Sequence, residues 1–226
     1  GLARKAQRDP HQPLSVLYLG RLDAQKGLHR LSEVMQASAK DTLDWRIIGK
    51  AVVGKGAQTI SPDLLRVLEP ALTRDEDLIA AFDWADVLVL LSDFEGLPLT
   101  ILEAMRQGVV PIATDVGAVG EVVKNAHNGI LLPLSQATQA CLTSLRALAS
   151  NPDLLARLST AAARDMVGRD WPQATKAFLD VLLPCRPLGQ LPPADLTAIP
   201  PDPVAQDPTS PDTKGRPPQR LAVSRP

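Results

Sequence analysis

The sequence predicts an α/β fold, with a Rossmann-like parallel sheet flanked by helices, followed by a proline-rich tail. Two observations predict the sheet: short apolar runs lack the alternation of half-exposed strands, and amphipathic stretches separate them. A third observation predicts the tail, because 12 of the 21 prolines fall within residues 184–226, which contain no aromatic residue. Such a segment can bury too little apolar surface to fold alone, so we expect it to be disordered.

Five apolar runs are expected to be strands that are buried on both faces. They are SVLYLG (15–20), WRIIG (45–49), DVLVLL (86–91), VVPIA (109–113) and GILLP (129–133). Helix candidates lie between them, and the connections are short. This strand-then-helix order favours right-handed crossovers, which are the connectivity of a Rossmann-like layered sandwich.

Several helix starts carry capping signals, in which a polar side chain accepts a hydrogen bond from the first turn. These signals are Ser61-Pro62, Asn151-Pro152 and a capping box formed by Thr73 with Glu76. Pro98 is also expected to open a helix, because proline suits the first helical position. The last segments before the tail look purely helical, at about 135–150, 152–167 and 171–183.

Composition and charge restrict the partners of the chain. The 226 residues are 45% hydrophobic and carry a formal net charge of -1, so no global basic field attracts nucleic acid or an anionic membrane. The two cysteines, Cys141 and Cys185, form no C-x-x-C motif, which favours a reducing compartment. The three histidines lack metal-ligand spacing, so no metal site is expected. No uncharged run reaches the roughly 18 residues of a membrane span, and the start lacks a signal-peptide pattern.

Loops that follow the strands of a parallel sheet can bind anions, and the first two such loops carry different signals for an anion site. In GRLDAQKG, Gly20 permits a sharp turn, while Arg21 and Lys26 supply two cations that suit phosphate oxygens. Taken alone, such cations are more often solvated charges on a loop than a phosphate site. The loop KAVVGKG contains neither G-x-x-x-x-G-K-[ST] nor G-x-G-x-x-G, so we expect it to be a flexible surface loop.

The third loop, SDFEGLPLTILEAM, holds two carboxylates, Glu95 and Glu103, with seven residues between them. Gly96 permits close approach of the backbone, and the amides of the following helix would point beyond the strand, where they can stabilise a phosphate. Glu103 has a second interpretation as an acidic residue that is favourable in the first turn of a helix. Glu95 is harder to explain as a cap, because capping would ordinarily use Ser, Thr, Asp or Asn.

In order and spacing, three segments resemble the C-terminal, donor-binding half of a family 4 (group 1) retaining glycosyltransferase with the GT-B fold. The segments are GRLDAQKG, TRDEDLIAAFDWADVLVLLSDFEGLPLTILEAM and GVVPIATDVGAVGEVVKNAHNGILL. The resemblance implies a Rossmann-like donor-binding domain over residues 15–183, followed by the tail over 184–226. It also implies that residues 1–14 are a linker from an N-terminal Rossmann half that this chain lacks and that would bind the acceptor.

The resemblance implies roles for individual residues. Arg21 and Lys26 would clamp the donor pyrophosphate and stabilise the departing nucleoside diphosphate, and both would be catalytic together with Glu95. Glu95 would face the hydroxyls of the donor hexose, and Glu103 would accept hydrogen bonds from the ribose hydroxyls. Carboxylates suit the sugars on either side of an anionic diphosphate, because they only accept hydrogen bonds. The further implied substrate contacts are Gly20, Leu72, Gly96, Leu97, Pro98, Leu99 and Thr100.

The implied reaction transfers a hexose from a UDP- or GDP-linked sugar to an acceptor hydroxyl with retention, without a metal cofactor. The acceptor would be a glycan, a lipid or a small molecule, and the protein would lie in the cytoplasm or at the inner membrane face. The chain departs from the family at Gly49-Lys50, where relatives have a Gly-acid-Gly turn, and at Ala118, where a second glycine is common. Two alternatives stay open: a non-catalytic nucleotide-sugar-binding or scaffolding domain of a larger polysaccharide-synthesis protein, and another GT-B enzyme such as an epimerase or a phosphorylase.

Overall fold

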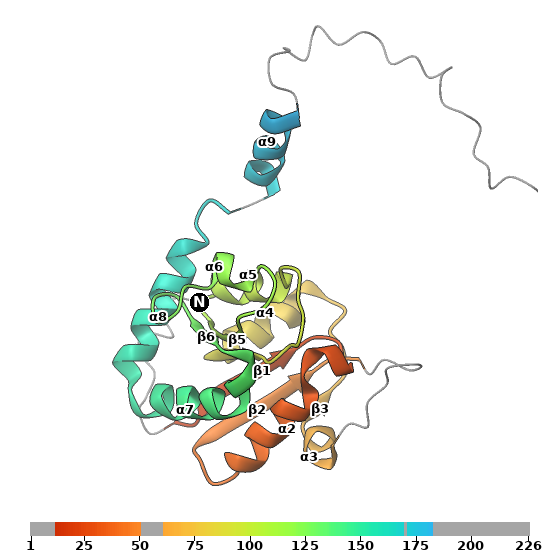
Figure 1. Ribbon diagram of the computed structural model, residues 1–226, viewed down its shortest axis with the longest axis vertical. Helices are drawn as coiled ribbons and strands as arrows, with labels where there is room; N and C mark the ends of the chain where they lie inside the picture. The colour runs from red at the N-terminus through yellow and green to blue at the C-terminus, as the bar shows by residue number, and fades with distance from the viewer. Residues whose placement is uncertain (1–11, 51–60, 170, 183–226) are drawn as a thin grey trace, which may run out of the picture. The chain divides into compact units, whose positions relative to one another are not determined.

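A computed structural model of the protein describes residues 12–50, 61–169 and 171–182 (Figure 1). The chain divides into two units, residues 1–173 and 174–226, and the first unit contains the whole sheet. Most of the expected linker, the greater part of the KAVVGKG loop and the expected tail lie outside the described residues.

Six parallel strands form one sheet in the order β3-β2-β1-β4-β5-β6. The strands are β1 Leu14–Leu19, β2 Leu43–Ile48, β3 Leu68–Glu69, β4 Val87–Leu90, β5 Val110–Thr114 and β6 Ile130–Leu132. The predicted α/β class with a parallel sheet is therefore confirmed. All five predicted strands are present, and every residue of β4 and β5 is buried, as expected for strands covered on both faces.

Helices cover both faces of this sheet. In the first unit they are η1 Ala24–Lys26, α2 Leu28–Ala37, α3 Pro62–Arg66, α4 Asp75–Trp84, α5 Leu99–Arg106, α6 Val119–Val122, η2 Leu134–Gln136, α7 Ala137–Ser150 and α8 Pro152–Asp165. A further helix, α9 Trp171–Leu182, spans the boundary between the two units. In the view of Figure 1, α2, α3 and α7 lie below the sheet, while α5 and α6 lie above it. Among the described residues, no helix is both long enough and apolar enough to cross a membrane.

Two of the predicted helix caps are confirmed. The Oγ of Ser61 accepts a hydrogen bond from the amide of Leu64 at the start of α3, at 3.4 Å. The Oδ1 of Asn151 accepts from the amide of Leu154 at the start of α8, at 3.0 Å. Each cap precedes a proline in the first turn, so the local sequence alone specifies where these helices begin.

The capping box that the sequence predicts at Thr73 and Glu76 is wrong. Helix α4 begins at Asp75, and its N-cap residue is Arg74, which makes no side-chain cap. Arg74 instead contacts both carboxylate oxygens of Asp77, at 2.8 and 2.6 Å. Three acidic residues occupy the first turn, where the helix dipole favours negative charge, and this electrostatic term takes the place of the cap.

The core on both faces of the sheet is aliphatic, with Tyr18 and Phe82 among its largest fully buried side chains. Cys141 of α7 is also buried, and burial raises the pKa of its thiol to about 12. A thiol in such surroundings stays protonated at neutral pH, so Cys141 serves packing and not nucleophilic chemistry.

Candidate functional site

The strand order identifies the place where a ligand would bind. From β1 the chain continues to β2 on one side, and from β4 it continues to β5 on the other side, although β1 and β4 are neighbours. In open parallel sheets, ligands bind beyond the carboxyl ends of strands at such a switch point. The loops that follow β1 and β4 are two of the segments in which the sequence predicts a site.

Lys26 and Glu95 meet at this switch point. The Nζ of Lys26 lies 2.7 Å from Oε1 of Glu95, and the Oγ of Ser92 donates to the same oxygen at 2.6 Å. Glu95 is only 8% exposed, and the side chain of Lys26 is 15% exposed. A carboxylate with so little hydration needs such partners, because burying it unpaired would be strongly unfavourable. The structure thus joins two predicted site residues that lie 69 residues apart.

Four further hydrogen bonds fasten the two loops together. The side-chain amide of Gln25 donates to the carbonyl of Phe94 at 2.9 Å, and the backbone carbonyl of Gln25 accepts from the amide of Asp93 at 2.8 Å. Arg30 in α2 donates to the carbonyl of Leu91 at 3.0 Å and to the carboxylate of Asp93 at 2.5 Å. Because these bonds surround the Lys26–Glu95 pair, the two loops form one structural unit.

Two glycines permit this close approach. Gly27 has a φ of 65°, and a Cβ at this position would lie 1.9 Å from the carbonyl oxygen of Leu91. Gly117, which follows β5, has a φ of 55°, and a Cβ there would lie 1.8 Å from the carbonyl oxygen of Glu95. Both separations are too short for any side chain, and both φ values favour glycine. These glycines therefore let neighbouring backbones hold the loops in place.

Gly96 opens the segment that is expected to meet the substrate. A Cβ at Gly96 would meet no atom within 4 Å, so this residue borders open space. Its carbonyl accepts from the amide of Ala118 at 3.0 Å. Ala118 has a φ of -93°, so the missing second glycine of the family pattern is not needed here. Leu97 and Leu99 are exposed, at 38% and 56%, beside this open space.

The start of α5 presents backbone amides without a side-chain cap. The helix begins at Leu99 and Pro98 is its N-cap residue, so the prediction that Pro98 occupies the first helical position is off by one residue. The reason is local, since Pro98 has an extended ψ of 117°. A proline N-cap has no side-chain acceptor, which leaves the amides of Leu99 and Thr100 suited to an external anion.

Among the described residues, no hydrogen bond or ion pair links the side chain of Glu103 to the Lys26–Glu95 pair. Glu103 is in the second turn of α5, whose first turn holds no acidic residue, so the interpretation of Glu103 as a first-turn acid is wrong. Its pKa is raised, chiefly because partial burial removes water from the carboxyl and also because Asp75 lies nearby. The side chain remains exposed and can accept hydrogen bonds from hydroxyl groups.

Among the contacts between described residues, neither Arg21 nor Leu72 contacts the Lys26–Glu95 pair through its side chain. The side chain of Arg21 is 65% exposed and lies 3.4 Å from the carboxylate of Asp23. Its backbone is fixed, because the buried Tyr18 hydroxyl donates to the carbonyl of Arg21 at 2.6 Å, next to the turn at Gly20. Leu72 is half-buried and packs against the hydrophobic core. Arg21 thus combines an anchored backbone with a guanidinium that can reorient.

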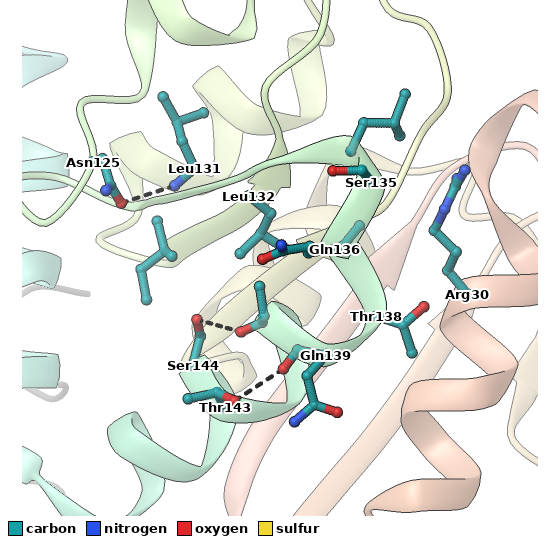
Figure 2. Close-up of a pocket in the computed structure, with 14 residues that line it drawn as sticks. Arg30, Asn125, Leu131, Leu132, Ser135, Gln136, Thr138, Gln139, Thr143 and Ser144 are labelled. Carbon is teal, nitrogen blue, oxygen red and sulfur yellow. Dashed lines mark hydrogen bonds between the residues drawn. The ribbon is translucent and has the colours of Figure 1, made fainter.

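A separate pocket of about 680 Å³ lies at the end of β6 and the start of α7 (Figure 2). Arg30 is the charged residue among those that line it, and its guanidinium is bonded to the β4–α5 loop. The hydroxyls of Thr143 and Ser144 donate to carbonyls of their own helix, at 3.0 and 2.7 Å. The lining therefore lacks the convergent charges that the switch point has.

The residues that hold the site, as opposed to those expected to touch a ligand, were not identified from the sequence. They are Gln25, Gly27, Ser92 and Gly117. Ser92 stands three residues before Glu95, a spacing that allows a contact within one turn, so a local signal existed. Gln25 and Gly117 act on residues far along the chain, and no local pattern reveals such partners. Within the described ranges, no cluster of three or more His, Cys, Asp or Glu side chains could hold a metal.

Comparison with known proteins gives a family match and distant relatives. The family model described as glycosyl transferases group 1 matches residues 2–165. The chain is 27% identical over 178 residues to a GDP-mannose:cellobiosyl-diphosphopolyprenol alpha-mannosyltransferase of Xanthomonas campestris, covering 74% of this chain and 46% of that protein. It is 32% identical over 158 residues to a GDP-mannose-dependent alpha-mannosyltransferase of Mycolicibacterium smegmatis, covering 69% and 39%. The chain thus spans less than half the length of these relatives.

Solved structures share the fold. The crystal structure of Anabaena HepE in complex with UDP-glucose superposes with a TM-score of 0.64 at 18% identity, covering 78% of this chain and 50% of that one. The C-terminal domain of a group 1 glycosyl transferase, LpcC from Francisella tularensis, gives 0.55 at 22% identity, covering 76% and 93%. The described sheet and its helices are therefore those of one GT-B half, as the sequence predicts.

Proposed function

Since this chain belongs to the group 1 glycosyltransferases, we propose that it binds a nucleoside diphosphate sugar and forms the donor side of a hexose transfer. One observation carries the proposal. The Lys26–Glu95 pair, in which the carboxylate is buried and the ammonium group is partly exposed, lies at the switch point of the sheet, where a cation for a diphosphate and a carboxylate for a sugar stand side by side.

The diphosphate is proposed to bind between the two cationic side chains and the start of α5. Lys26 supplies a point charge, and the exposed guanidinium of Arg21 can swing onto two phosphate oxygens. The first amides of α5 add donors and the positive end of the helix dipole. These groups would stabilise the negative charge that builds up on the departing nucleoside diphosphate. We propose that they serve in place of a divalent metal ion.

The two carboxylates are proposed to take the sugars. Glu95 accepts hydrogen bonds from the hexose hydroxyls, and Glu103, one turn into α5, accepts from the ribose. No nucleophile stands among the predicted motif residues, so we propose departure and attack on the same face, with retention, through an oxocarbenium-like transition state. The acceptor is proposed to be held by a region outside this chain, because the chain spans less than half the length of the two mannosyltransferases that it resembles.

The donor is proposed to be linked to GDP or UDP. Two relatives are named as users of GDP-mannose, and the HepE structure holds UDP-glucose. Titration calorimetry of the chain with GDP and UDP, and with GMP and UMP as controls, tests the donor site. We expect one diphosphate to bind, its monophosphate to bind at least tenfold more weakly, and chelation by EDTA to change neither. No heat with either diphosphate at millimolar concentration would remove the donor-site proposal.

A further inference from the structure

We propose that Ser92 is a positioning residue that orients Glu95 in the donor site, an inference that rests on the proposed function. Ser92 follows β4 and is 1% exposed. Its Oγ donates to Oε1 of Glu95 at 2.6 Å, and both groups are buried. A serine hydroxyl so placed cannot reach water, so its hydrogen bond to the carboxylate is its main polar interaction.

Ser92 is itself held from the neighbouring strand. Thr114, the last residue of β5, is 1% exposed, and its Oγ1 donates to the carbonyl of Ser92 at 2.6 Å. The sequence of contacts from Thr114 through Ser92 to Glu95 leads from the rigid sheet to the carboxylate. Glu95 is therefore oriented by the sheet as well as by its ion pair.

The two carboxylate oxygens of Glu95 differ in their contacts. Lys26 and Ser92 both contact Oε1, and among the hydrogen bonds between described residues none ends on Oε2. Oε1 thus fixes the side chain, and Oε2 is the oxygen available to a hydroxyl of the hexose. Each carboxylate oxygen can accept more than one hydrogen bond, so one oxygen suffices for both donors.

A bound diphosphate would weaken the contact between Lys26 and Glu95, because its oxygens compete with Glu95 for the ammonium group of Lys26. When Lys26 turns toward phosphate oxygens, Ser92 remains as the buried donor that keeps Glu95 in place. Loss of the Ser92 hydroxyl should therefore weaken ligands that contact Glu95, which are those that carry a hexose. A bare nucleoside diphosphate does not reach Glu95, and its affinity should change little.

The test is titration calorimetry of Ser92→Ala with GDP, GDP-mannose, UDP and UDP-glucose. For the donor that the wild type binds, we expect the Kd of the nucleotide sugar to rise about tenfold to a hundredfold, which is typical for loss of a hydrogen bond to a charged group. The Kd of the matching bare diphosphate should stay within about threefold. Ser92→Thr, which keeps the hydroxyl, should restore part of the lost affinity for the nucleotide sugar.

Ser159→Ala is the matched control. Ser159 lies in α8, is 3% exposed, and its Oγ donates to the carbonyl of Gly108 at 2.6 Å, so the variant removes an equally buried hydroxyl away from the site. It should leave the ratio of the two Kd values unchanged. If Ser92→Ala fails to fold, Thr114→Val should show the same selective loss, because it releases Ser92 from β5.

The outcomes separate this inference from the proposed function. A wild type that binds no nucleoside diphosphate would overturn the donor site and this inference together. A wild type that binds both ligands, with equal losses or no losses in Ser92→Ala, or in Thr114→Val where that variant stands in, would overturn the positioning role alone.

Discussion

Gly117 and Gly96 lie beside the same glutamate but meet different requirements. Gly117→Ala should lower the free energy of unfolding by more than about 1 kcal/mol, because the left-handed φ alone disfavours alanine by that amount. The added Cβ would also collide with the carbonyl oxygen of Glu95. Gly96→Ala has open space around its Cβ, so the fold should be unaffected, while binding of a nucleotide sugar should weaken.

Urea denaturation of both variants and calorimetry of Gly96→Ala provide the measurements. Wild-type stability in Gly117→Ala would contradict the close approach of the β5–α6 turn to Glu95. Wild-type affinity in Gly96→Ala would show that no ligand passes this glycine.

Single residues of the site could be predicted from the sequence, but their contacts could not. Lys26 and Glu95 stand in recognisable motifs, and each has a plausible role on its own. Their direct pairing depends on the order of strands in the sheet, because 69 residues separate them. The spacing of Ser92 from Glu95 permits a contact, but a serine next to a strand is usually structural, so its bond to Glu95 becomes evident only in the structure.

The starts of α8 and α4 differ in capping, and this difference can be tested by mutation. Asn151→Ala should lower the free energy of unfolding by about 1 kcal/mol, because it removes the cap on the amide of Leu154 at the start of α8. Thr73→Ala is the control, since Thr73 precedes α4 and does not cap it. Its effect on urea denaturation should be within about 0.5 kcal/mol, as for other surface substitutions. Equal losses would mean that the capping box at Thr73 exists after all.

The turn before β6 is attached to α8 through Asp165. Its Oδ2 accepts from Nδ2 of Asn128 at 2.9 Å and lies 3.1 Å from Nε2 of His127. Partial burial raises the pKa of this carboxyl, but the bond from Asn128 and the nearby charges of His127 and Arg164 outweigh that effect, so the net pKa is lowered. The ionised form of Asp165 is therefore the form that the fold favours.

This lowered pKa sets the direction of a pH dependence. The contribution of Asp165 to stability is fully present above its unfolded pKa of about 3.9, and it is lost as the pH falls through the lower folded value. Unfolding by urea should therefore show wild type more stable than Asp165→Asn at neutral pH, with the difference shrinking below about pH 4. A difference that stays constant through this acid range would contradict the role of the charge.

The strands with long apolar runs could be predicted, while β3 could not. Leu68–Glu69 contains two residues, and Glu69 points its carboxylate at Arg46 of β2, with both oxygens contacted at 2.6 Å. The hydrogen bond from Arg46 lowers the pKa of Glu69, although partial burial opposes it. An edge strand that carries an ion pair lacks the apolar pattern of a central strand, so it could not be predicted from hydrophobic runs in the sequence.

At the scale of the whole molecule, donor binding and transfer should separate. We expect residues 1–226 alone to bind the donor but to transfer no sugar to an acceptor, because the chain is proposed to hold only one of the two reactants. Holding both reactants supplies on the order of 7–11 kcal/mol in well-oriented intramolecular reactions. Incubation with radiolabelled donor and a mixed acceptor panel tests this. Slow hydrolysis fits the expectation, and efficient transfer contradicts it.

The neighbouring positions of β1 and β4 also determine when the site can form during folding. Lys26 and Glu95 meet only after the chain closes a loop of 69 residues, a step whose length-dependent entropy amounts to about 4 kcal/mol. Contacts of such sequence separation slow folding, and here β2 and β3 lie within the loop. In a nascent chain from which β4 and the following loop have not yet been synthesised, Lys26 lacks its partner Glu95. Competence to bind a nucleotide should therefore arise in refolding together with the central sheet, and never before it.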